Sequence, residues 1–384
     1  MTTHAYIGAD IFDGERRHRG MALLVESARV VGIVAETDVP DEAEATDIGG
    51  GTLAPGFVDL QVNGGAGVMF NDAPTAQTLG LIAGAHAGLG TTSLLPTLIT
   101  DTPEHSRAAV EAAQKAVERG TPGIAGLHLE GPHLSVARKG AHGASFIRPI
   151  NDADMALYVE AAKDLPALML TIAPETVPPE QIATLTDAGV IVSLGHTDAD
   201  FETCVTAAKA GAICSTHLFN AMSGLGNREP GCVGATLATG RLSAGLIADG
   251  IHVHPAAISA ALRAKLGPGE IFLVSDAMSP AGTEQREFTL NGRRILRENG
   301  RLTLEDGTLA GADLDMAQAI RTMVNVVGCE VDVALRMATL APANLLPKAN
   351  GIGQLTEGGP ADFVWLDDDL RLRGTWQAGE QVRA

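Results

Sequence analysis

The sequence predicts an α/β fold, a (β/α)8 TIM-like barrel with a small β-sandwich domain formed from both chain termini. Three observations support this prediction. The chain has 384 residues, 45% hydrophobic and 19% charged, so it can bury a large core. In its middle part, eight short apolar runs alternate with helical stretches. Its two ends consist of brief β segments without helical periodicity.

The eight predicted strands cover residues 56–62, 91–97, 124–130, 168–172, 190–196, 213–217, 245–248 and 271–276. Predicted helices cover residues 76–89, 104–119, 152–163, 179–188, 200–210 and 255–265, with further helices at 312–327 and 332–340. Near-continuous apolar strands that alternate with helices indicate a parallel sheet covered by helices. Eight such units favour a closed barrel over an open doubly wound sheet.

The two chain ends are expected to fold together, because chain ends often lie close to one another in space. The short apolar runs of the ends are residues 5–8, 20–26, 29–34, 361–366 and 374–382. We therefore expect a small β domain from residues 1–53 plus 348–384, and the barrel from residues 54–347.

Charge and cysteine content narrow the possible partners and compartment. The net charge of −19 argues against nucleic acid and anionic membranes as partners. The chain shows no signal-peptide pattern and no apolar run of membrane-spanning length, which favours a cytoplasmic protein. Its cysteines form no CxxC pair and are interpreted as small buried residues: Cys204, Cys214, Cys232 and Cys329.

In a barrel of this kind the chemistry lies at the carboxyl ends of the strands. Glu130 ends the third predicted strand, His196 the fifth and His217 the sixth. One carboxylate and two imidazoles leave a metal with an open position for water, which is typical of a catalytic site. Asp276 ends the eighth strand and could accept a proton from that water. The structural alternatives are that Glu130 and Asp276 cap helices, and that His196 and His217 are two unrelated histidines at strand ends.

Other polar residues near this rim have mainly structural interpretations. His128 shares a strand face with Glu130 but lies one layer deeper, so we expect an internal hydrogen-bonding role. Asp59, His133 and His254 are also expected to be structural. His252 follows the seventh strand and is the exception, because we interpret it as a substrate contact.

Several motifs run along the whole barrel: Pro55-Gly-Phe-Val-Asp59-Leu-Gln61-Val-Asn63-Gly, Gly126-Leu-His-Leu-Glu130-Gly-Pro132, Lys139-Gly-Ala-His142, Gly195-His196, Thr216-His217-Leu-Phe-Asn220-Ala-Met, Arg228-Glu-Pro-Gly, Asp249-Gly-Ile-His252 and Ser275-Asp276-Ala. With these motifs the chain resembles the amidohydrolase superfamily, and within it the family of N-acetylglucosamine-6-phosphate deacetylases. The resemblance implies metal-dependent hydrolysis of the N-acetyl group of a phosphorylated amino sugar.

The resemblance also implies one metal per subunit, with Zn²⁺ as the expected ion. Its ligands would be Glu130, His196 and His217. Where the family often carries His-x-His on the first strand, this chain has Gln61-Val-Asn63, and Gln61 is expected to support the ligands without binding the metal. The fourth strand has no bridging lysine, which also argues against a second metal.

Further site residues come from the same resemblance. The expected phosphate and sugar contacts are Asn220, the Ala221 backbone, Arg228 and His252. Arg228 is expected to reach across from a neighbouring subunit, which implies a homodimer. Ala141 and His142 should line the sugar and acetyl site, with His142 also stabilising the oxyanion. Leu309, Ala310 and Gly311 match a loop that closes over the substrate.

Three rival functions remain open. The first is deacetylation of a close relative such as N-acetylgalactosamine 6-phosphate. The second is hydrolysis of a cyclic amide, against which the absent His-x-His and bridging lysine argue. The third is a non-catalytic binding module, which predicts the loss of metal ligands that this chain retains.

Overall fold

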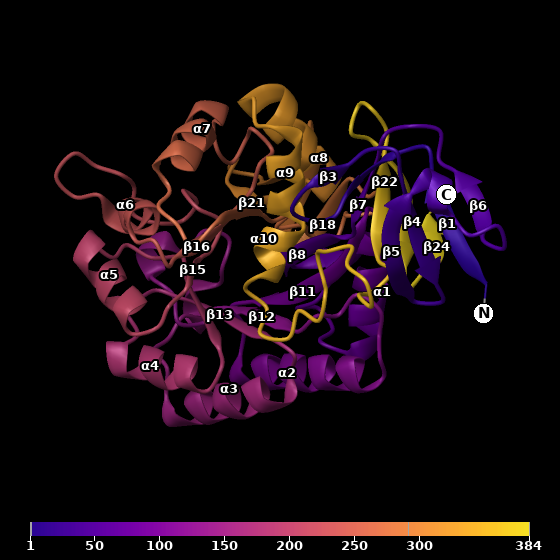
Figure 1. The fold of residues 1–384 in the computed structure, drawn as a ribbon. Helices are drawn as coiled ribbons and strands as arrows, with labels where there is room; N and C mark the ends of the chain where they lie inside the picture. Colours follow the sequence, from indigo (N-terminus) through magenta and orange to yellow (C-terminus); the bar gives the residue numbers. More distant parts are fainter. Residues whose placement is uncertain (1, 291, 384) are drawn as a thin grey trace.

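The computed structural model describes residues 2–290 and 292–383 (Figure 1). Its centre is an eight-stranded parallel sheet in which sequence neighbours are also spatial neighbours. The strands are β8 (Phe57–Val62), β11 (Thr91–Ile99), β12 (Leu127–Glu130), β13 (Leu168–Ile172), β14 (Ile191–Leu194), β15 (Cys214–Ser215), β16 (Ser243–Leu246) and β17 (Ile271–Leu273). All of their residues are buried, as expected for a parallel sheet covered on both faces. The predicted barrel is confirmed.

The barrel closes between its first and last strands, through the residues that follow β17. The Asp276 N–H donates to the Gln61 carbonyl at 3.1 Å, and the Asn63 N–H donates to the Ala277 carbonyl at 2.9 Å. Val62 and Ala277 pair in parallel at this seam. The closing hydrogen bonds therefore lie at the carboxyl rim, next to Asp276.

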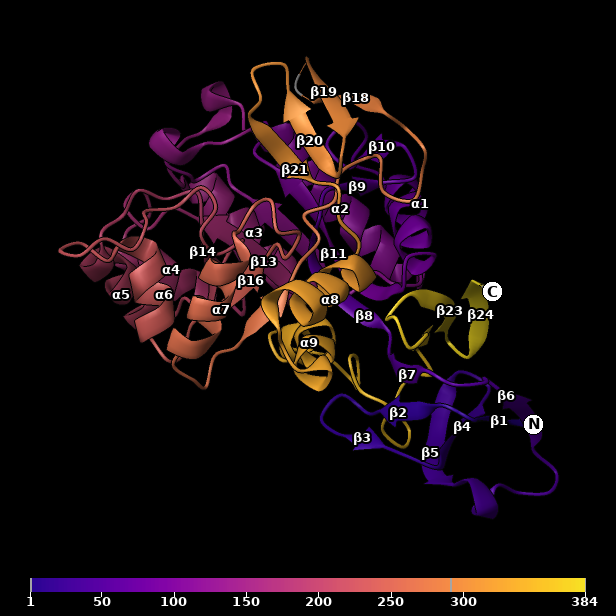
Figure 2. The same cartoon turned by 90° about the horizontal axis from the view of Figure 1, so that it is seen from above.

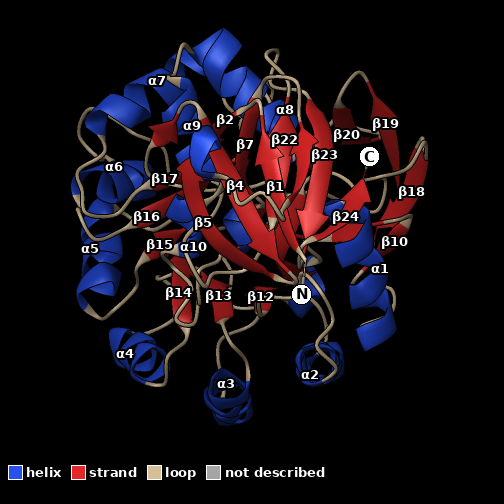
Figure 3. Cartoon of the chain, turned by 45° about the vertical axis from the view of Figure 1, so that its right-hand side comes forward, coloured by secondary structure: helices blue, strands red, loops and turns tan. Residues whose placement is uncertain are grey.

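Helices surround the barrel, as the arc from α2 to α7 in Figure 3 shows. They are α1 (Ala76–Ala87), α2 (Pro103–Glu118), α3 (Asp152–Asp164), α4 (Pro179–Asp187), α5 (Phe201–Lys209), α6 (Gly231–Ala238), α7 (Pro255–Ala264), α8 (Met316–Thr322), the π-helical turn η4 (Met323–Val327), α9 (Val331–Ala338) and α10 (Leu340–Ala343). Local sequence starts several of them: Asn151 forms a capping box with Asp154, and Thr102 precedes a proline at the first turn of α2. Among the described residues, no helix combines the length and apolar character needed to cross a membrane.

Strands from both chain ends form two further sheets, which lie to one side of the barrel (Figure 2). The first sheet contains β1 (Thr3–Ile7), β4 (Met21–Glu26), β5 (Arg29–Ala35) and β6 (Glu44–Asp47). The second contains β2 (Asp10–Phe12), β3 (Arg17–His18), β7 (Thr52–Pro55), β22 (Phe363–Leu366), β23 (Leu372–Gln377) and β24 (Glu380–Arg383). An apolar cluster between them includes Tyr6, Phe363 and Trp376, and the Phe363 and Trp376 rings stack at 4.7 Å. The prediction that both termini build a small β unit is confirmed.

A four-stranded antiparallel sheet between β17 and α8 was not predicted. It consists of β18 (Glu287–Leu290), β19 (Arg293–Glu298), β20 (Arg301–Leu304) and β21 (Leu309–Ala312). Figure 2 shows it above the short pair β9 (Gly64–Gly65) and β10 (Val68–Met69). Its inner face packs on Met69 and Met278, beside the barrel mouth. We call these four strands the flap sheet.

Several predicted boundaries were wrong. Ala312 ends β21, so the helix predicted over 312–327 begins only at Met316. The strand predicted over 245–248 lies at Ser243–Leu246. Helix α6 was missed because seven of its eight residues are buried, which leaves almost no polar face for a helical pattern to reveal.

Candidate active site

Four polar residues lie at the carboxyl rim of the barrel: Glu130, His196, His217 and Asp276. Only Glu130 lies inside a strand. Glu130 is the last residue of β12. The strands predicted to end at His196, His217 and Asp276 instead end at Leu194, Ser215 and Leu273. Each of these three side chains therefore comes from the turn after its strand.

These turns have an uncommon backbone. His196, His217 and Asp276 adopt positive φ angles of 47°, 30° and 49°. A residue other than glycine in this left-handed region costs on the order of 1 kcal/mol or more. Hydrogen bonds at the turns offset the strain; for example, the His196 carbonyl accepts from the Ser135 N–H at 2.8 Å. Strain gathered on three neighbouring polar residues is characteristic of a functional site.

Glu130, His196 and His217 converge on one point, and we call these three residues the rim cluster. Glu130 Oε1 lies 3.1 Å from His217 Nε2 and 3.2 Å from His196 Nε2. The two Nε2 atoms lie 3.0 Å apart. The three atoms thus form a nearly equilateral triangle, and all three side chains are buried.

The triangle has the chemistry and the size of one face of a metal site. His196 Nδ1 lies 2.8 Å from the Arg138 carbonyl, which can only accept. The ring proton is therefore on Nδ1, and Nε2 points a lone pair at the cluster. Tetrahedral zinc with bonds of about 2.0–2.1 Å separates its ligand atoms by about 3.3 Å. The residues present fit a divalent cation.

The electrostatics of the rim cluster favour an ionised carboxylate. Burial works to raise the pKa of Glu130, but the adjacent His196 and His217 rings hold that pKa well below its ordinary value. Burial likewise works to lower the pKa of His217, and Glu130 overcomes this and raises it. A negative carboxylate beside two imidazoles is the charge arrangement that a divalent cation requires.

Asp276 lies beside the rim cluster without belonging to its triangle. Its Oδ1 accepts from Asn63 Nδ2 at 2.7 Å and from Gln61 Nε2 at 3.2 Å. Burial, together with the charge of Glu130, raises the pKa of Asp276 to about 6. Gln61 Nε2 also donates to Glu130 Oε1 at 3.1 Å, so one amide fixes both carboxylates.

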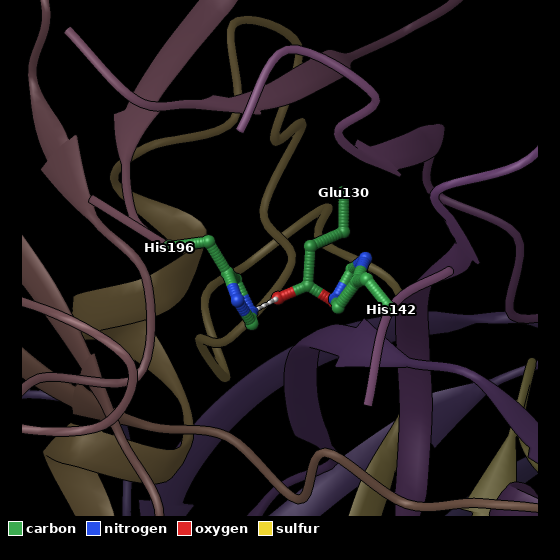
Figure 4. Close-up of side chains that lie close together, drawn as sticks. All are labelled: Glu130, His142 and His196. Carbon is green, nitrogen blue, oxygen red and sulfur yellow. Dashed lines mark ion pairs between the residues drawn. The ribbon is translucent and has the colours of Figure 1, made fainter. Parts of the chain in front are cut away.

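His142 lies in the loop after β12, and its side chain faces Glu130 (Figure 4). Its Nε2 lies 3.7 Å from Glu130 Oε2, and the ligand atoms of Glu130, His142 and His196 lie within 4.8 Å of one another. The Thr100 N–H contacts His142 Nδ1 at 3.3 Å, and the Thr100 hydroxyl lies 2.8 Å from the same atom. Because a backbone N–H only donates, Nδ1 is the acceptor and Nε2 carries the proton. Burial lowers the pKa of His142 to about 3, so the ring is neutral and donates into the cavity.

A cavity of about 550 Å³ opens above the rim cluster. Most of the predicted site residues line it: Glu130, Ala141, His142, His196, His217, Asn220, Ala221, His252, Asp276, Leu309 and Gly311. Ala310 does not line it, because its side chain is buried in the core of the flap sheet. Arg228 does not line it either, and its side chain is exposed.

The predictions missed several residues of this cavity. Asn63, Ile99, Arg138, Met278, Leu290 and Thr308 line it, and Thr100 supports it from behind. Asn63 had a sequence signal, because it lies two residues after Gln61 and therefore on the same strand face. Leu290 ends strand β18 of the missed flap sheet, and Thr308 lies in the turn before its last strand, so neither residue had a sequence signal without that sheet.

His252 lies on the wall of the cavity and is held by an acid. Its Nδ1 lies 2.6 Å from Asp249 Oδ2. Burial works to raise the pKa of Asp249, but the hydrogen bond from His252 lowers it below its ordinary value. The ionised Asp249 thereby orients the imidazole on the wall of the cavity.

A (β/α)8 barrel that gathers two imidazoles, a buried carboxylate and a separate acid at its carboxyl rim defines a metal-binding hydrolase. The family model of the amidohydrolase family matches residues 52–382, and the chain belongs to this family.

Within this family, the chain is similar in sequence to deacetylases of phosphorylated amino sugars. The chain is 47% identical over 330 residues to N-acetylgalactosamine-6-phosphate deacetylase of Shewanella sp. (strain ANA-3), covering 86% of this chain and 83% of the relative. It is 39% identical over 354 residues to human N-acetylglucosamine-6-phosphate deacetylase, covering 88% and 85%.

Solved structures of two N-acetylglucosamine-6-phosphate deacetylases superpose on this chain. N-acetylglucosamine-6-phosphate deacetylase from Pasteurella multocida superposes with a TM-score of 0.94 at 32% identity, covering 99% of both chains. A mutant of the Mycobacterium smegmatis enzyme, in complex with N-acetyl-D-glucosamine-6-phosphate, superposes with a TM-score of 0.91 at 32% identity and covers 100% of both chains.

Proposed function

We propose that this protein hydrolyses the N-acetyl group of N-acetylglucosamine 6-phosphate, giving glucosamine 6-phosphate and acetate. The observation that carries the proposal is the rim cluster beside Asp276, in a cavity large enough for a sugar phosphate. The human relative and the two solved structures, which bear the name of this activity, support the choice of substrate.

We propose that Glu130, His196 and His217 hold one divalent cation, and that this ion is Zn²⁺. Two imidazoles and one carboxylate with an open fourth position suit catalytic zinc. A cation held there would lower the pKa of a water molecule to about 7 and polarise the acetyl carbonyl. Gln61 and Asn63 donate to Asp276, so in this arrangement they are supports and not ligands of a second ion.

Asp276 has the position and the pKa of a proton carrier. In the proposed reaction its carboxylate accepts a proton from the attacking water and later donates it to the departing amine. Burial raises the pKa of Asp276 above its ordinary value, which favours the second of these steps, and a neighbouring cation would favour the first. His142 donates its Nε2–H to the carbonyl oxygen as negative charge develops there. With Asp276 and His142 in these roles, the proposed reaction needs no further acid or base.

Substrate recognition is assigned to the cavity wall. We propose that His252, Asn220 and the Ala221 backbone bind the sugar phosphate, with Ala141, Leu309 and Gly311 enclosing the sugar. Arg228 is exposed and lies outside the cavity of its own subunit. The bidentate guanidinium suits phosphate, so we propose that Arg228 serves the neighbouring site of a homodimer.

N-acetylgalactosamine 6-phosphate is the second candidate substrate. The observation that favours it is the Shewanella relative, which bears the name of that activity at 47% identity. The two sugars differ at one hydroxyl, so one site can accept both with different efficiencies.

We further propose that the enzyme works in the cytoplasm. Its four cysteines are all unpaired: Cys204, Cys214 and Cys232 are buried and Cys329 is half-buried. A chain without disulfides is typical of a reducing compartment.

Acetate release from the two sugar phosphates tests the proposed function. The zinc-loaded enzyme should release acetate from N-acetylglucosamine 6-phosphate, should lose activity on chelation, and should regain it when Zn²⁺ is restored. Unphosphorylated N-acetylglucosamine should be a poor substrate. A higher kcat/KM for the galactose epimer would move the assignment to the second candidate. If the metal-loaded enzyme released acetate from neither sugar phosphate, both candidate functions would be excluded.

A further inference from the structure

A second polar cavity lies between the barrel and the terminal strands. Its volume is about 330 Å³. The lining residues are Leu89, Asp315, Ala317, Arg321, Arg371, Leu372, Arg373 and Arg383. Four of the eight are arginines, and they come from helix α8, strands β23 and β24, and the residue before β23. We call this cavity the arginine pocket.

The charge of the arginine pocket opposes that of the whole chain. The net charge of the chain is −19, whereas the pocket has four guanidinium groups and one lining carboxylate. Arg373 pairs with Asp367 at 2.7 Å. Within residues 2–290 and 292–383, Arg321, Arg371 and Arg383 have no carboxylate partner within 4.0 Å. Like charges brought together without counter-charge repel one another, and a bound anion removes that repulsion.

Backbone contacts fix two of these arginines in place. Arg321 Nη1 donates to the Leu370 carbonyl at 3.2 Å. Arg383 Nη1 donates to the Gly88 carbonyl at 2.7 Å. Each guanidinium has five N–H donors, so these bonds hold the side chains and leave most donors for another partner. A ligand would meet a partly ordered set of donors and lose less entropy on binding.

The arginine pocket is separate from the active site. Gly88 and Leu89 form the turn that leads into β11, so the pocket lies toward the amino end of that strand. Glu130 and the other rim residues lie at the carboxyl ends. The two cavities share no lining residue.

We propose that the arginine pocket binds a small organic phosphate. A planar guanidinium matches phosphate oxygens bidentately and stays charged at any relevant pH. Asp315 and Asp367 offset two of the four positive charges, and the remaining two suit a phosphate dianion. Because the donors come from a barrel helix and from terminal strands, the bound phosphate joins the two parts of the molecule.

Calorimetric titration of the zinc-loaded enzyme with fructose 1,6-bisphosphate tests this proposal. No other sugar phosphate is added, because the proposal predicts that it would compete for the arginine pocket. The wild-type protein should bind at least one equivalent of the probe per chain, and the variants below separate the arginine pocket from the phosphate subsite of the active site. The double variant Arg321→Gln, Arg371→Gln should bind it at least about tenfold more weakly, because each lost charge-assisted contact weakens binding.

A matched control separates the site from general charge. The double variant Arg107→Gln, Arg119→Gln removes the same charge from helix α2 and its end, where both side chains are exposed, and should bind like wild type. The single variant Arg371→Gln covers the case in which Arg321→Gln disturbs folding, because the Arg371 side chain makes no hydrogen bond within the described residues. It should weaken binding severalfold.

Three results would overturn the proposal. The first is no heat of binding in the wild type at millimolar probe. The second is equal affinity of the wild type and both pocket variants. The third is tighter binding of citrate than of the sugar bisphosphate, which would replace a phosphate by a tricarboxylate as the ligand. None of these results bears on acetate release, so the proposed function stands or falls separately.

Discussion

Two sets of histidines near the barrel mouth differ in the partners of their ring nitrogens. His128 lies one layer below the rim, with Nδ1 3.1 Å from the Thr97 hydroxyl and Nε2 2.7 Å from the Thr171 hydroxyl. His133 is held by the Arg148 carbonyl and the Tyr158 hydroxyl, each at 2.9 Å. Both rings are therefore satisfied within the protein.

The rim histidines are not satisfied in this way. His196 and His217 turn their Nε2 atoms toward each other and toward Glu130, at distances of 3.0–3.2 Å. These nitrogens point at one another and at a carboxylate instead of at fixed protein partners, which leaves their lone pairs available to a cation. Residue type and burial alone do not separate the two sets, since all these histidines are buried; the partner of each ring nitrogen does.

Truncation of one histidine from each set gives the sharpest test of this difference. His217→Ala should abolish metal binding and activity, whereas His128→Ala should keep the metal. The second variant should instead lose about 2–4 kcal/mol of unfolding free energy, because it leaves a cavity and two buried hydroxyls with fewer partners. Metal analysis and chemical denaturation of both variants measure these effects. Loss of metal from His128→Ala would contradict the distinction.

Asp276→Asn tests whether the acid beside the rim cluster belongs to the chemistry or to the metal site. The amide keeps the shape of the side chain but cannot accept the proton, so turnover should fall about 10³-fold. Metal content should stay at the wild-type level, because Asp276 is not part of the ligand triangle. Retention of most of the activity would mean that another group acts as the base.

Thr100→Val tests whether His142 depends on a partner as the satisfied histidines do. The variant removes the hydroxyl 2.8 Å from His142 Nδ1, so the ring loses part of its orientation. We expect kcat to fall about tenfold with little change in KM, as for other groups that orient active-site side chains. Thr100→Ser restores the hydroxyl and should recover most of the rate. Equal rates for the Val and Ser variants would count against this role.

The smallest expected effect concerns pH and a satisfied histidine. Burial lowers the pKa of His133 to about 4, below its ordinary value near 6.5. The unfolded chain therefore takes up a proton below pH 6.5 that the folded protein refuses until about pH 4. The stabilisation is fully present above pH 6.5 and is lost as the pH falls, by at most about 3 kcal/mol.

His133→Gln measures that contribution. Its unfolding free energy should change less than that of the wild type between pH 7 and pH 4.5, as followed by urea denaturation with the metal bound. A slope identical to that of the wild type would show that His133 takes no part in the acid instability.

The sequence was informative wherever a residue type and its place on a strand determined the outcome. The eight apolar runs predicted the barrel, and polar residues at their ends predicted Glu130, His196, His217 and Asp276 at one rim. The convergence of Glu130, His196 and His217 within about 3 Å depends on left-handed turns at both histidines, and Asp276 reaches the rim through a third such turn. Those angles have no signal in histidine or aspartate, so the distances could not be predicted.

The flap sheet was missed although its turns carried a signal. Asn299-Gly300 and Asp306-Gly307 are typical of tight hairpin turns, and both glycines have positive φ. Its strands are only four to six residues long and alternate exposed with buried residues, unlike the near-continuous apolar runs that identify the barrel strands. Without the flap sheet, the roof of the cavity could not be predicted either.

The hydrogen bonds that close the barrel run through Asp276 itself. Its N–H bonds to the first strand through Gln61, and its carbonyl accepts from Ala312 at the end of the flap sheet. A local opening at this seam would carry the carboxylate away from the rim cluster while the outer helices stayed folded. Mild denaturant should therefore inactivate the enzyme before it melts the helices, and amide exchange at the seam should report the same event.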